Sequence, residues 1–156
     1  MASLTITVGI SGSGKSTWAK SWVAENPAQR CRVNRDDLRV MLYTVASYTP
    51  EEEEGVDAII KPMVAGLLEK DRDVVLDNTH LHILSLKEWQ DFAIEHNVPF
   101  NIRFFAIEPD EAKARVRSRA DAGGLDVIES FIDAQHEKYE KLMRILNDIT
   151  GKNDVL

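Results

Sequence analysis

Short apolar runs alternate with longer amphipathic stretches along this chain of 156 residues. Brief runs rich in β-branched or aromatic residues predict strands at residues 4–8, 31–34, 73–77 and 100–107. The stretches between them predict helices at residues 15–26, 36–43, 50–70, 85 onwards, 108–123 and 126–147. Because strands alternate with helices, we expect an α/β, doubly wound fold with a mostly parallel sheet and helices on both faces.

Individual side chains indicate how two of these helices begin. Asp36 or Asp37 can cap the second helix, since a carboxylate oxygen accepts from the free N–H groups of a first turn. Ser85 and Glu88 have the spacing of a capping box, in which each side chain satisfies a backbone N–H near the other. We therefore expect these residues to mark the first turns of their helices.

Length and composition indicate a single domain spanning residues 1–156. Apolar residues make up 44% of the chain and charged residues 29%, which is ordinary for a globular protein. Trp18 and Trp22 stand four apart on the first predicted helix, and we expect both to pack in the core. No apolar run approaches the roughly 20 residues that span a bilayer, so no membrane partner is expected. Cys31 is the single cysteine, which excludes an internal disulfide and fits a cytoplasmic location.

The net charge of −7 is unevenly distributed. Residues 1–50 carry six Lys or Arg against three Asp or Glu, and residues 103–119 carry five against three. The acidic excess lies in residues 51–102 and 120–156. Local potential matters more to a bound anion than total charge does, so the composition is compatible with a nucleic-acid substrate. A protein that coats long duplexes is not expected.

The strongest motif lies at residues 9–16, Gly-Ile-Ser-Gly-Ser-Gly-Lys-Ser, which match the pattern Gly-x-x-x-x-Gly-Lys-Ser/Thr between a predicted strand and a predicted helix. Glycines let backbone N–H groups approach phosphate oxygens, and the helix N-terminus adds further donors. We expect Lys15 to bridge the β- and γ-phosphates and Ser16 Oγ to ligate Mg²⁺. The predicted nucleotide-binding residues of this P-loop are Gly12, Ser13, Gly14, Lys15, Ser16 and Thr17.

A candidate acceptor site follows the second strand, in the run Asn34-Arg35-Asp36-Asp37-Leu38-Arg39. Ligands of open α/β sheets bind at the carboxyl edge, where this run begins. A carboxylate there can accept a hydroxyl proton, and an arginine one helical turn later can hold an anionic part of the acceptor. The alternative interpretation is that these residues only cap a helix and form surface ion pairs.

Two further features suit the same chemistry. Arg115 and Arg119 project from one face of a predicted helix and can stabilise charge that develops during phosphoryl transfer, whereas Arg117 points elsewhere. A solvated basic helix is the alternative. Asp77 ends an apolar strand, as a Walker-B carboxylate does, and can orient Mg²⁺ through water; the alternative is a turn-capping aspartate.

Taken together, the P-loop, the run from Asn34 to Arg39, the motif Asp77-Asn78-Thr79 and the arginine-rich segment resemble the kinase domain of phage and bacterial polynucleotide 5′-kinases. The resemblance covers nearly the whole chain. It implies a P-loop kinase-like fold with an arginine-bearing helical lid, and transfer of the γ-phosphate of ATP, with Mg²⁺, to the 5′-hydroxyl end of DNA or RNA. A cytoplasmic location follows, which would be the host cytoplasm for a phage-encoded protein.

The same resemblance assigns roles to individual residues. Asp36 becomes the general base, and Arg39 contacts the phosphate next to the terminal nucleoside. Lys15 and Ser16 hold the nucleotide phosphates and the metal, while Arg115 and Arg119 match the paired arginines of the family's lid; Lys15, Asp36 and Arg119 are the predicted catalytic residues. Several family members carry a fused 3′-phosphatase domain, for which residues 1–156 leave no room, so a kinase alone is expected.

Two other functions stay open on sequence grounds. A P-loop kinase can act on another hydroxyl, such as that of a nucleoside, a small metabolite or a modified base in DNA. A nucleotide-dependent switch is the second, although the chain lacks the Asn-Lys-x-Asp motif with which guanine-specific switches read their base.

Overall fold

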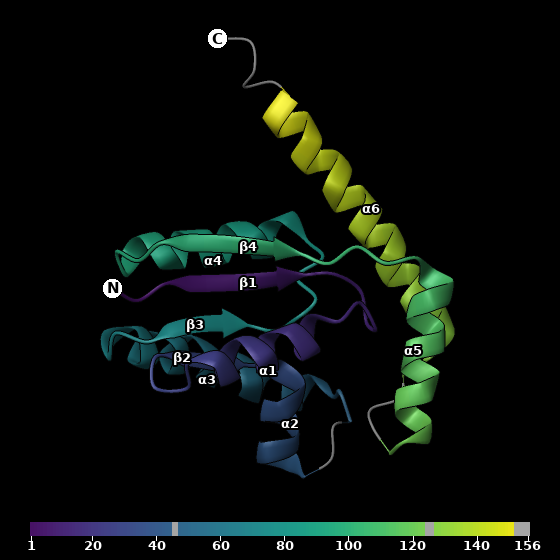
Figure 1. The fold of residues 1–156 in the computed structure, drawn as a ribbon, viewed down its shortest axis with the longest axis horizontal. Helices are drawn as coiled ribbons and strands as arrows, with labels where there is room; N and C mark the ends of the chain where they lie inside the picture. Colours follow the sequence, from purple (N-terminus) through teal and green to yellow (C-terminus); the bar gives the residue numbers. More distant parts are fainter. Residues whose placement is uncertain (45–46, 124–126, 152–156) are drawn as a thin grey trace.

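The computed structural model describes residues 1–44, 47–123 and 127–151 (Figure 1). Within these residues strands and helices alternate, in agreement with the order that the sequence predicts. The elements are β1 (Leu4–Val8), α1 (Lys15–Glu25), β2 (Arg30–Val33), α2 (Arg35–Tyr43), α3 (Pro50–Glu69), β3 (Asp73–Leu76), α4 (Ile83–Glu95), β4 (Phe100–Phe104), α5 (Pro109–Asp121) and α6 (Glu129–Gly151).

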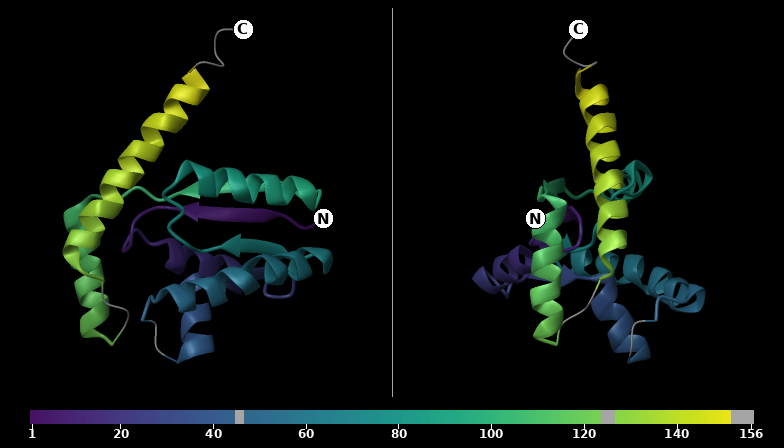
Figure 2. Two further views of the ribbon diagram at one scale, coloured as in Figure 1. Left: turned by 180° about the vertical axis from the view of Figure 1, so that it is seen from behind. Right: turned by 90° about the vertical axis from the view of Figure 1, so that its right-hand side faces the viewer.

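The four strands form one sheet in the order β2-β3-β1-β4, and every pairing is parallel. Leu4 lies opposite Val74 on one side and Phe100 on the other, which sets the register of the central strands. Helix α1 covers one face of the sheet, and α3 and α4 cover the other (Figure 2). The predicted doubly wound α/β fold is confirmed.

The core lies between the sheet and the helices α3 and α4. Leu4, Ile6 and Val8 of β1 are fully buried because the central strand is covered on both sides. Helix α3 contributes a buried stripe at intervals of four residues, Val56, Ile60, Val64 and Leu68. This packing fixes the carboxyl ends of β1, β2 and β3 next to one another, at the edge of the sheet that carries the P-loop.

Helix boundaries differ from the sequence prediction where a neighbouring residue takes over the cap. Helix α2 begins at Arg35, because the Asn34 side chain accepts from the Asp37 N–H at 3.0 Å, so neither aspartate is the cap. Helix α4 begins at Ile83, two residues before Ser85. The predicted capping box is therefore wrong, and Glu88 instead pairs with Lys61 at 2.6 Å.

Two other boundaries shift by a few residues. Strand β4 ends at Phe104, three residues short of the predicted end, because only residues 100–104 have partners in β1. Helix α6 runs to Gly151, beyond the predicted end at Asn147. The predicted start of that helix at Asp126, and Gly124 of the predicted Gly123-Gly124 stop, lie outside the described residues.

Trp18 and Trp22 do not join the core, contrary to the prediction. Both are half-buried, and their rings stack on each other with centroids 6.0 Å apart. The guanidinium of Arg103 lies 4.3 Å from the Trp18 ring and that of Arg30 lies 4.7 Å from the Trp22 ring. The indoles flank the narrow buried face of α1, on which Ala19 is the fully buried apolar residue.

Helices α5 and α6 stand at the carboxyl edge of the sheet, where the strand arrows end (Figure 1). They run past each other as a pair, and the C-terminal half of α6 extends beyond the sheet. None of the helices in the three described ranges combines the length and the hydropathy needed to cross a membrane.

Candidate active site

A cavity of about 630 Å³ opens at the carboxyl edge of the sheet. Four parts of the chain line it: the P-loop with the start of α1, the β2–α2 region with Tyr48, the residues that follow β3, and the pair of helices α5 and α6. The predicted site residues that line this cavity are Gly12, Gly14, Lys15, Ser16, Thr17, Asp36, Arg39, Asp77, Arg115 and Arg119. Segments distant in sequence thus meet where ligands of parallel sheets bind.

The glycines of the P-loop are required by its backbone. Gly12 has φ of 82° and Gly14 has φ of 94°, in the left-handed region that favours glycine. A Cβ at Gly12 would also lie 2.6 Å from the carbonyl oxygen of Ala112 in α5. Gly14 is the N-cap of α1 and provides no side-chain acceptor, so the free N–H groups of the first turn remain for an anion.

Lys15 is a buried cation, 7% exposed. Its Nζ donates to the carbonyl of Ile10 at 2.7 Å and lies 3.4 Å from Ser13 Oγ. Burial lowers its pKa from 10.5 to about 8, the nearby Asp77 carboxylate raises it in part, and the Arg119 guanidinium lowers it again. Burial disfavours the charged form of Lys15, so a bound phosphate, as a nearby negative charge, should stabilise the ammonium strongly.

Asp77 is buried at the end of β3, at 1% exposure. Its Oδ2 accepts from Arg32 Nε at 2.6 Å, whereas its Oδ1 has no hydrogen-bond partner in the described part of the chain. Buried carboxylate oxygens are normally paired, so this oxygen fits a ligand to Mg²⁺ or to its water. Ser16 lines the same cavity, and the two side chains together suit a magnesium ion at bound phosphates.

The two acceptor-side residues lie together. Arg39 is 5% exposed, and its Nη1 donates to Asp36 Oδ1 at 2.6 Å. Its Nε donates to Glu53 Oε1 at 2.7 Å, and Nη2 contacts the same oxygen. Arg39 is therefore held between two carboxylates at the cavity wall. It lines the same cavity as the P-loop, and it also forms ion pairs of the kind that the alternative interpretation predicts.

Of the two consecutive aspartates, Asp36 faces the cavity and Asp37 does not. Asp37 is exposed and accepts from Arg32, which also holds Asp77. Arg35 lines the cavity and pairs with Glu53 at 2.7 Å. Asp36 is thus the only residue of the two that is placed to accept a proton from a group bound between α2 and the P-loop.

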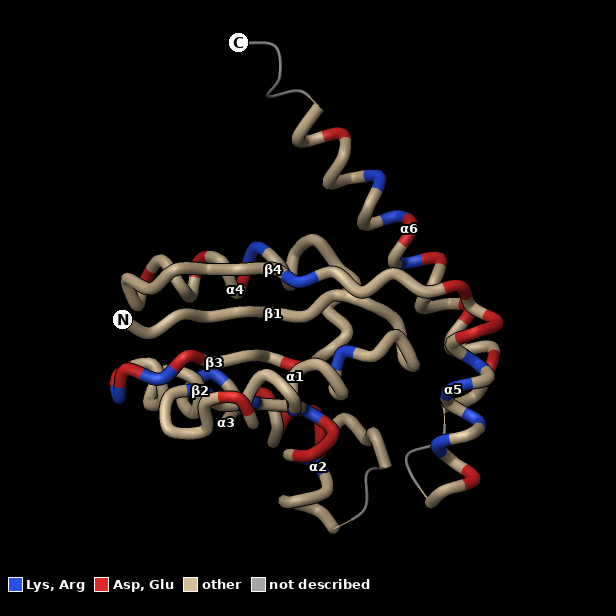
Figure 3. The backbone as a smooth tube through the Cα atoms, in the orientation of Figure 1, with Lys and Arg blue, Asp and Glu red and all other residues tan. Residues whose placement is uncertain are grey.

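The predicted lid arginines also reach the cavity. Arg115 and Arg119 both line it, and basic positions recur along α5 (Figure 3). Arg115 pairs with Glu111 at 2.5 Å, and its Nη1 approaches the Gly12 carbonyl at 3.5 Å. Arg117 points away from the cavity, as predicted.

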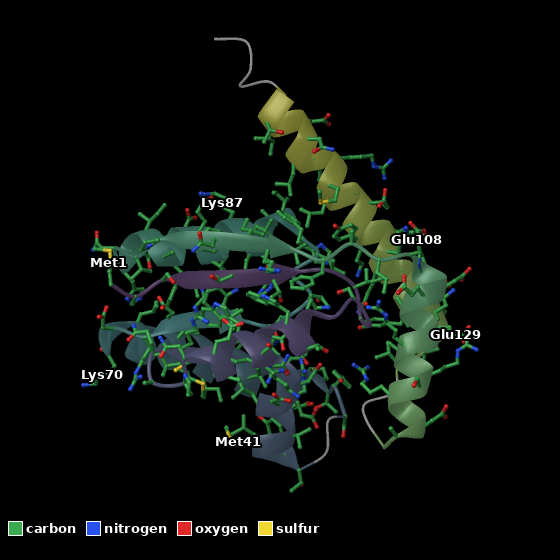
Figure 4. The ribbon with its side chains drawn as sticks, in the orientation of Figure 1. Met1, Met41, Lys70, Lys87, Glu108 and Glu129 are labelled. Atoms are coloured by element: carbon green, nitrogen blue, oxygen red, sulfur yellow. The ribbon has the colours of Figure 1, made fainter. Side chains whose placement is uncertain are left out.

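Glu129 marks the outer side of this helix pair (Figure 4), and its carboxylate lies 3.1 Å from Arg117 Nε. Arg117 therefore joins α5 to α6 on the side away from the sheet. Arg115 and Arg119 lie on the opposite side of α5, which faces the cavity.

Two contacts of the site have no local sequence signature. Gln135 of α6 is 7% exposed, lines the cavity, and accepts from the backbone N–H of Ser11 at 2.7 Å. Glu53 is one of four consecutive glutamates, which predict only a charged helix start. Helix α6 is thus attached directly to the P-loop, and α3 supplies the carboxylate that fixes Arg39.

Strand, glycine turn and helix, with a buried lysine and free helix N–H groups, define a P-loop nucleotide-binding protein. Residues 4–142 match the family described as AAA domain, and the chain belongs to that family. The chain is 30% identical over 152 residues, 89% of its length, to a protein of Autographa californica nuclear polyhedrosis virus that is named as a bifunctional polynucleotide kinase/RNA ligase.

A second relative, a bifunctional polynucleotide phosphatase/kinase of Schizosaccharomyces pombe, is 32% identical over 112 residues, 72% of this chain. The chain spans 21% and 22% of the lengths of these two relatives. A chain of the Pnkp1/Rnl/Hen1 RNA repair complex has a TM-score of 0.83 and 26% identity, covering 92% of this chain and 45% of that one. The resemblance to polynucleotide kinases that the sequence predicts is confirmed.

Proposed function

We propose that this chain is an ATP-dependent kinase module that transfers the γ-phosphate to the 5′-hydroxyl end of DNA or RNA. The observation that carries the proposal is the position of Asp36 and Arg39 in the same cavity as Lys15, Arg115 and Arg119. The names of the two relatives and of the repair complex point to the same reaction. Positioning and charge stabilisation are what phosphoryl transfer requires.

In the proposed reaction the 5′-oxygen attacks the γ-phosphorus, and the bond from that phosphorus to the β,γ-bridging oxygen breaks, so ADP leaves. The proton of the hydroxyl passes to a carboxylate oxygen of Asp36, which Arg39 orients through its 2.6 Å hydrogen bond. Backbone N–H groups of the P-loop and the Lys15 ammonium hold the phosphates, and Arg115 and Arg119 stabilise the charge on the equatorial oxygens.

Mg²⁺ would be held by Ser16 Oγ, with Asp77 Oδ1 contacting it through a water. Bound there, the ion neutralises charge on the β- and γ-phosphates. Oδ1, for which the described residues supply no hydrogen-bond donor, supports this assignment, because a buried oxygen without a donor is rare in proteins.

The experiment compares acceptors at fixed ATP labelled on the γ-phosphate. A 5′-hydroxyl oligonucleotide should take up label, and the same oligonucleotide with a 5′-phosphate should not. A nucleoside 3′-monophosphate should be a better acceptor than the free nucleoside, provided that Arg39 shares its guanidinium between Asp36 and an acceptor phosphate. Labelling of nucleosides but never of oligonucleotides would instead support a kinase of small hydroxyl acceptors.

A further inference from the structure

Tyr48 is the aromatic side chain that lines the cavity on the same side as Asp36 and Arg39, whereas Phe131 of α6 belongs to the helix pair of the lid. Tyr48 lies between α2 and α3 along the chain and lines the cavity together with Asp36 and Arg39. Half of the residue, 50%, is exposed. The Tyr48 hydroxyl lies 3.4 Å from Asp36 Oδ1, so the hydroxyl end of this side chain is next to the proposed general base.

Arg39 packs against the Tyr48 ring. The Arg39 guanidinium carbon lies 4.7 Å from the ring centroid, in the geometry of a cation–π contact. Hydrogen bonds to Asp36 and Glu53 hold Arg39 in place, so its guanidinium is a fixed surface against which the Tyr48 ring packs. Arg39 lies over the ring, and half of the residue is accessible at the cavity, where a planar ligand can reach it.

The backbone at Tyr48 is fixed as well. Glu52, 7% exposed, accepts from the N–H groups of Ser47 and Tyr48 at 2.9 and 2.8 Å. Tyr48 has φ of 56°, a conformation that non-glycine residues adopt at a cost. A buried carboxylate that binds two consecutive N–H groups stabilises this conformation and holds the side chain toward the cavity.

We propose that Tyr48 is the platform on which the terminal nucleobase of the acceptor stacks, and this rests on the proposed function. The base is joined through one ribose to the 5′-oxygen that must reach Asp36, and Tyr48 starts beside Asp36. Stacking on one tyrosine face accepts any purine or pyrimidine, because every base has a π-face. Tyr48 therefore gives affinity for a nucleotide end without selecting its sequence.

The test uses two oligonucleotides with a 5′-hydroxyl that differ only in whether the 5′-terminal residue carries a base or is abasic. For the unaltered chain, kcat/KM should be about 5- to 150-fold higher for the acceptor with the base, the range for one base stacked on one aromatic ring. Tyr48→Ala should remove this preference, so that kcat/KM becomes nearly equal for the two acceptors. Tyr48→Phe, which keeps the ring, should retain it.

Tyr43→Ala is the matched control. Tyr43 is also an exposed tyrosine of this region, but it packs over Gly55 of α3 and does not line the cavity. It should retain the preference. The KM for ATP, measured with the abasic acceptor, should be the same in all variants and reports that each has folded.

A preference for the base that survives in Tyr48→Ala, or an equal loss on both acceptors, overturns the proposal, since the second result would mean that Tyr48 only positions Asp36. If the kinase assignment itself is wrong, the unaltered chain will label neither oligonucleotide, a result that differs from both of these outcomes.

Discussion

Replacing Lys15 by methionine should stabilise the protein while it abolishes phosphate transfer. The Lys15 ammonium is 7% exposed, and burial is the main reason that its pKa falls from 10.5 to about 8. At about 1.4 kcal/mol per pH unit, this corresponds to roughly 3 kcal/mol against the charged amine in the folded, nucleotide-free state. Methionine has a similar shape and carries no charge into the same space.

Part of that gain is lost because the substitution removes the hydrogen bond from Nζ to the Ile10 carbonyl. Leaving this acceptor unpaired costs about 1 kcal/mol, so Lys15→Met should gain about 2 kcal/mol. In a domain of this size such a gain raises Tm by roughly 4–8 °C. Thermal unfolding at pH 7 without nucleotide measures it directly.

The pH dependence of the stability difference tests whether the buried charge of Lys15 is its cause. Below pH 8, Lys15 is charged in both the folded and the unfolded chain, and the full penalty is present. Between about pH 8 and 10.5 the unfolded chain binds a proton that the folded chain has lost, so the stability of the unaltered protein rises with pH relative to Lys15→Met. The gap between the two proteins should therefore narrow over this range.

Thermal unfolding with added nucleotide tests whether Lys15 binds phosphate. ATP with Mg²⁺ should raise the Tm of the unaltered protein and have little effect on Lys15→Met, because the Lys15 amine is the proposed phosphate ligand. If Lys15→Met melts at a lower temperature than the unaltered protein at pH 7, the buried charge of Lys15 stabilises the nucleotide-free fold, contrary to this prediction.

The remaining predictions concern the acceptor, the P-loop and α6. Asp36→Asn should lower transfer to a 5′-hydroxyl oligonucleotide by roughly 10²–10⁴-fold while leaving the Kd for ATP nearly unchanged, as isothermal titration would show; full activity would exclude it as the general base. Gly12→Ala should lower the free energy of unfolding by about 1–3 kcal/mol in urea, because of the positive φ and the approach to Ala112 of α5. Gln135→Leu should cost about 1–3 kcal/mol because the Ser11 N–H loses its acceptor, and Gln135→Glu, which keeps an acceptor, should cost less; equal losses in the two variants would argue against that hydrogen bond.

The fold and half of the site follow from local patterns in the sequence. The P-loop is a continuous motif whose strand, glycines and helix are neighbours along the chain, so its geometry can be predicted from spacing alone. Arg115 and Arg119 share a face for the same reason, because helical periodicity places residues four apart side by side. Parallel pairing then brings these segments to one edge of the sheet.

Contacts between distant segments are what the sequence does not reveal. Gln135 meets Ser11 across 124 positions, and no spacing rule links α6 to the P-loop. Glu53 is the member of the run Glu51–Glu54 that binds Arg39, a contact that depends on the packing of α3 against α2 and not on the sequence of α3 alone. The tryptophan prediction is wrong for a related reason: Trp18 and Trp22 stand at core spacing on α1, but the face they occupy lies beside the sheet.

The position of the transferred phosphate shows directly whether this chain is a 5′-hydroxyl kinase. The protein is incubated with ATP, Mg²⁺ and an oligonucleotide that has a free 5′-hydroxyl and a blocked 3′-end, and the product is sequenced by mass spectrometry. We predict one added phosphoryl group on the 5′-terminal nucleotide and an equal amount of ADP. Formation of ADP with the oligonucleotide unchanged, or a phosphate at any other position, would show that the chain does not phosphorylate 5′-hydroxyl ends.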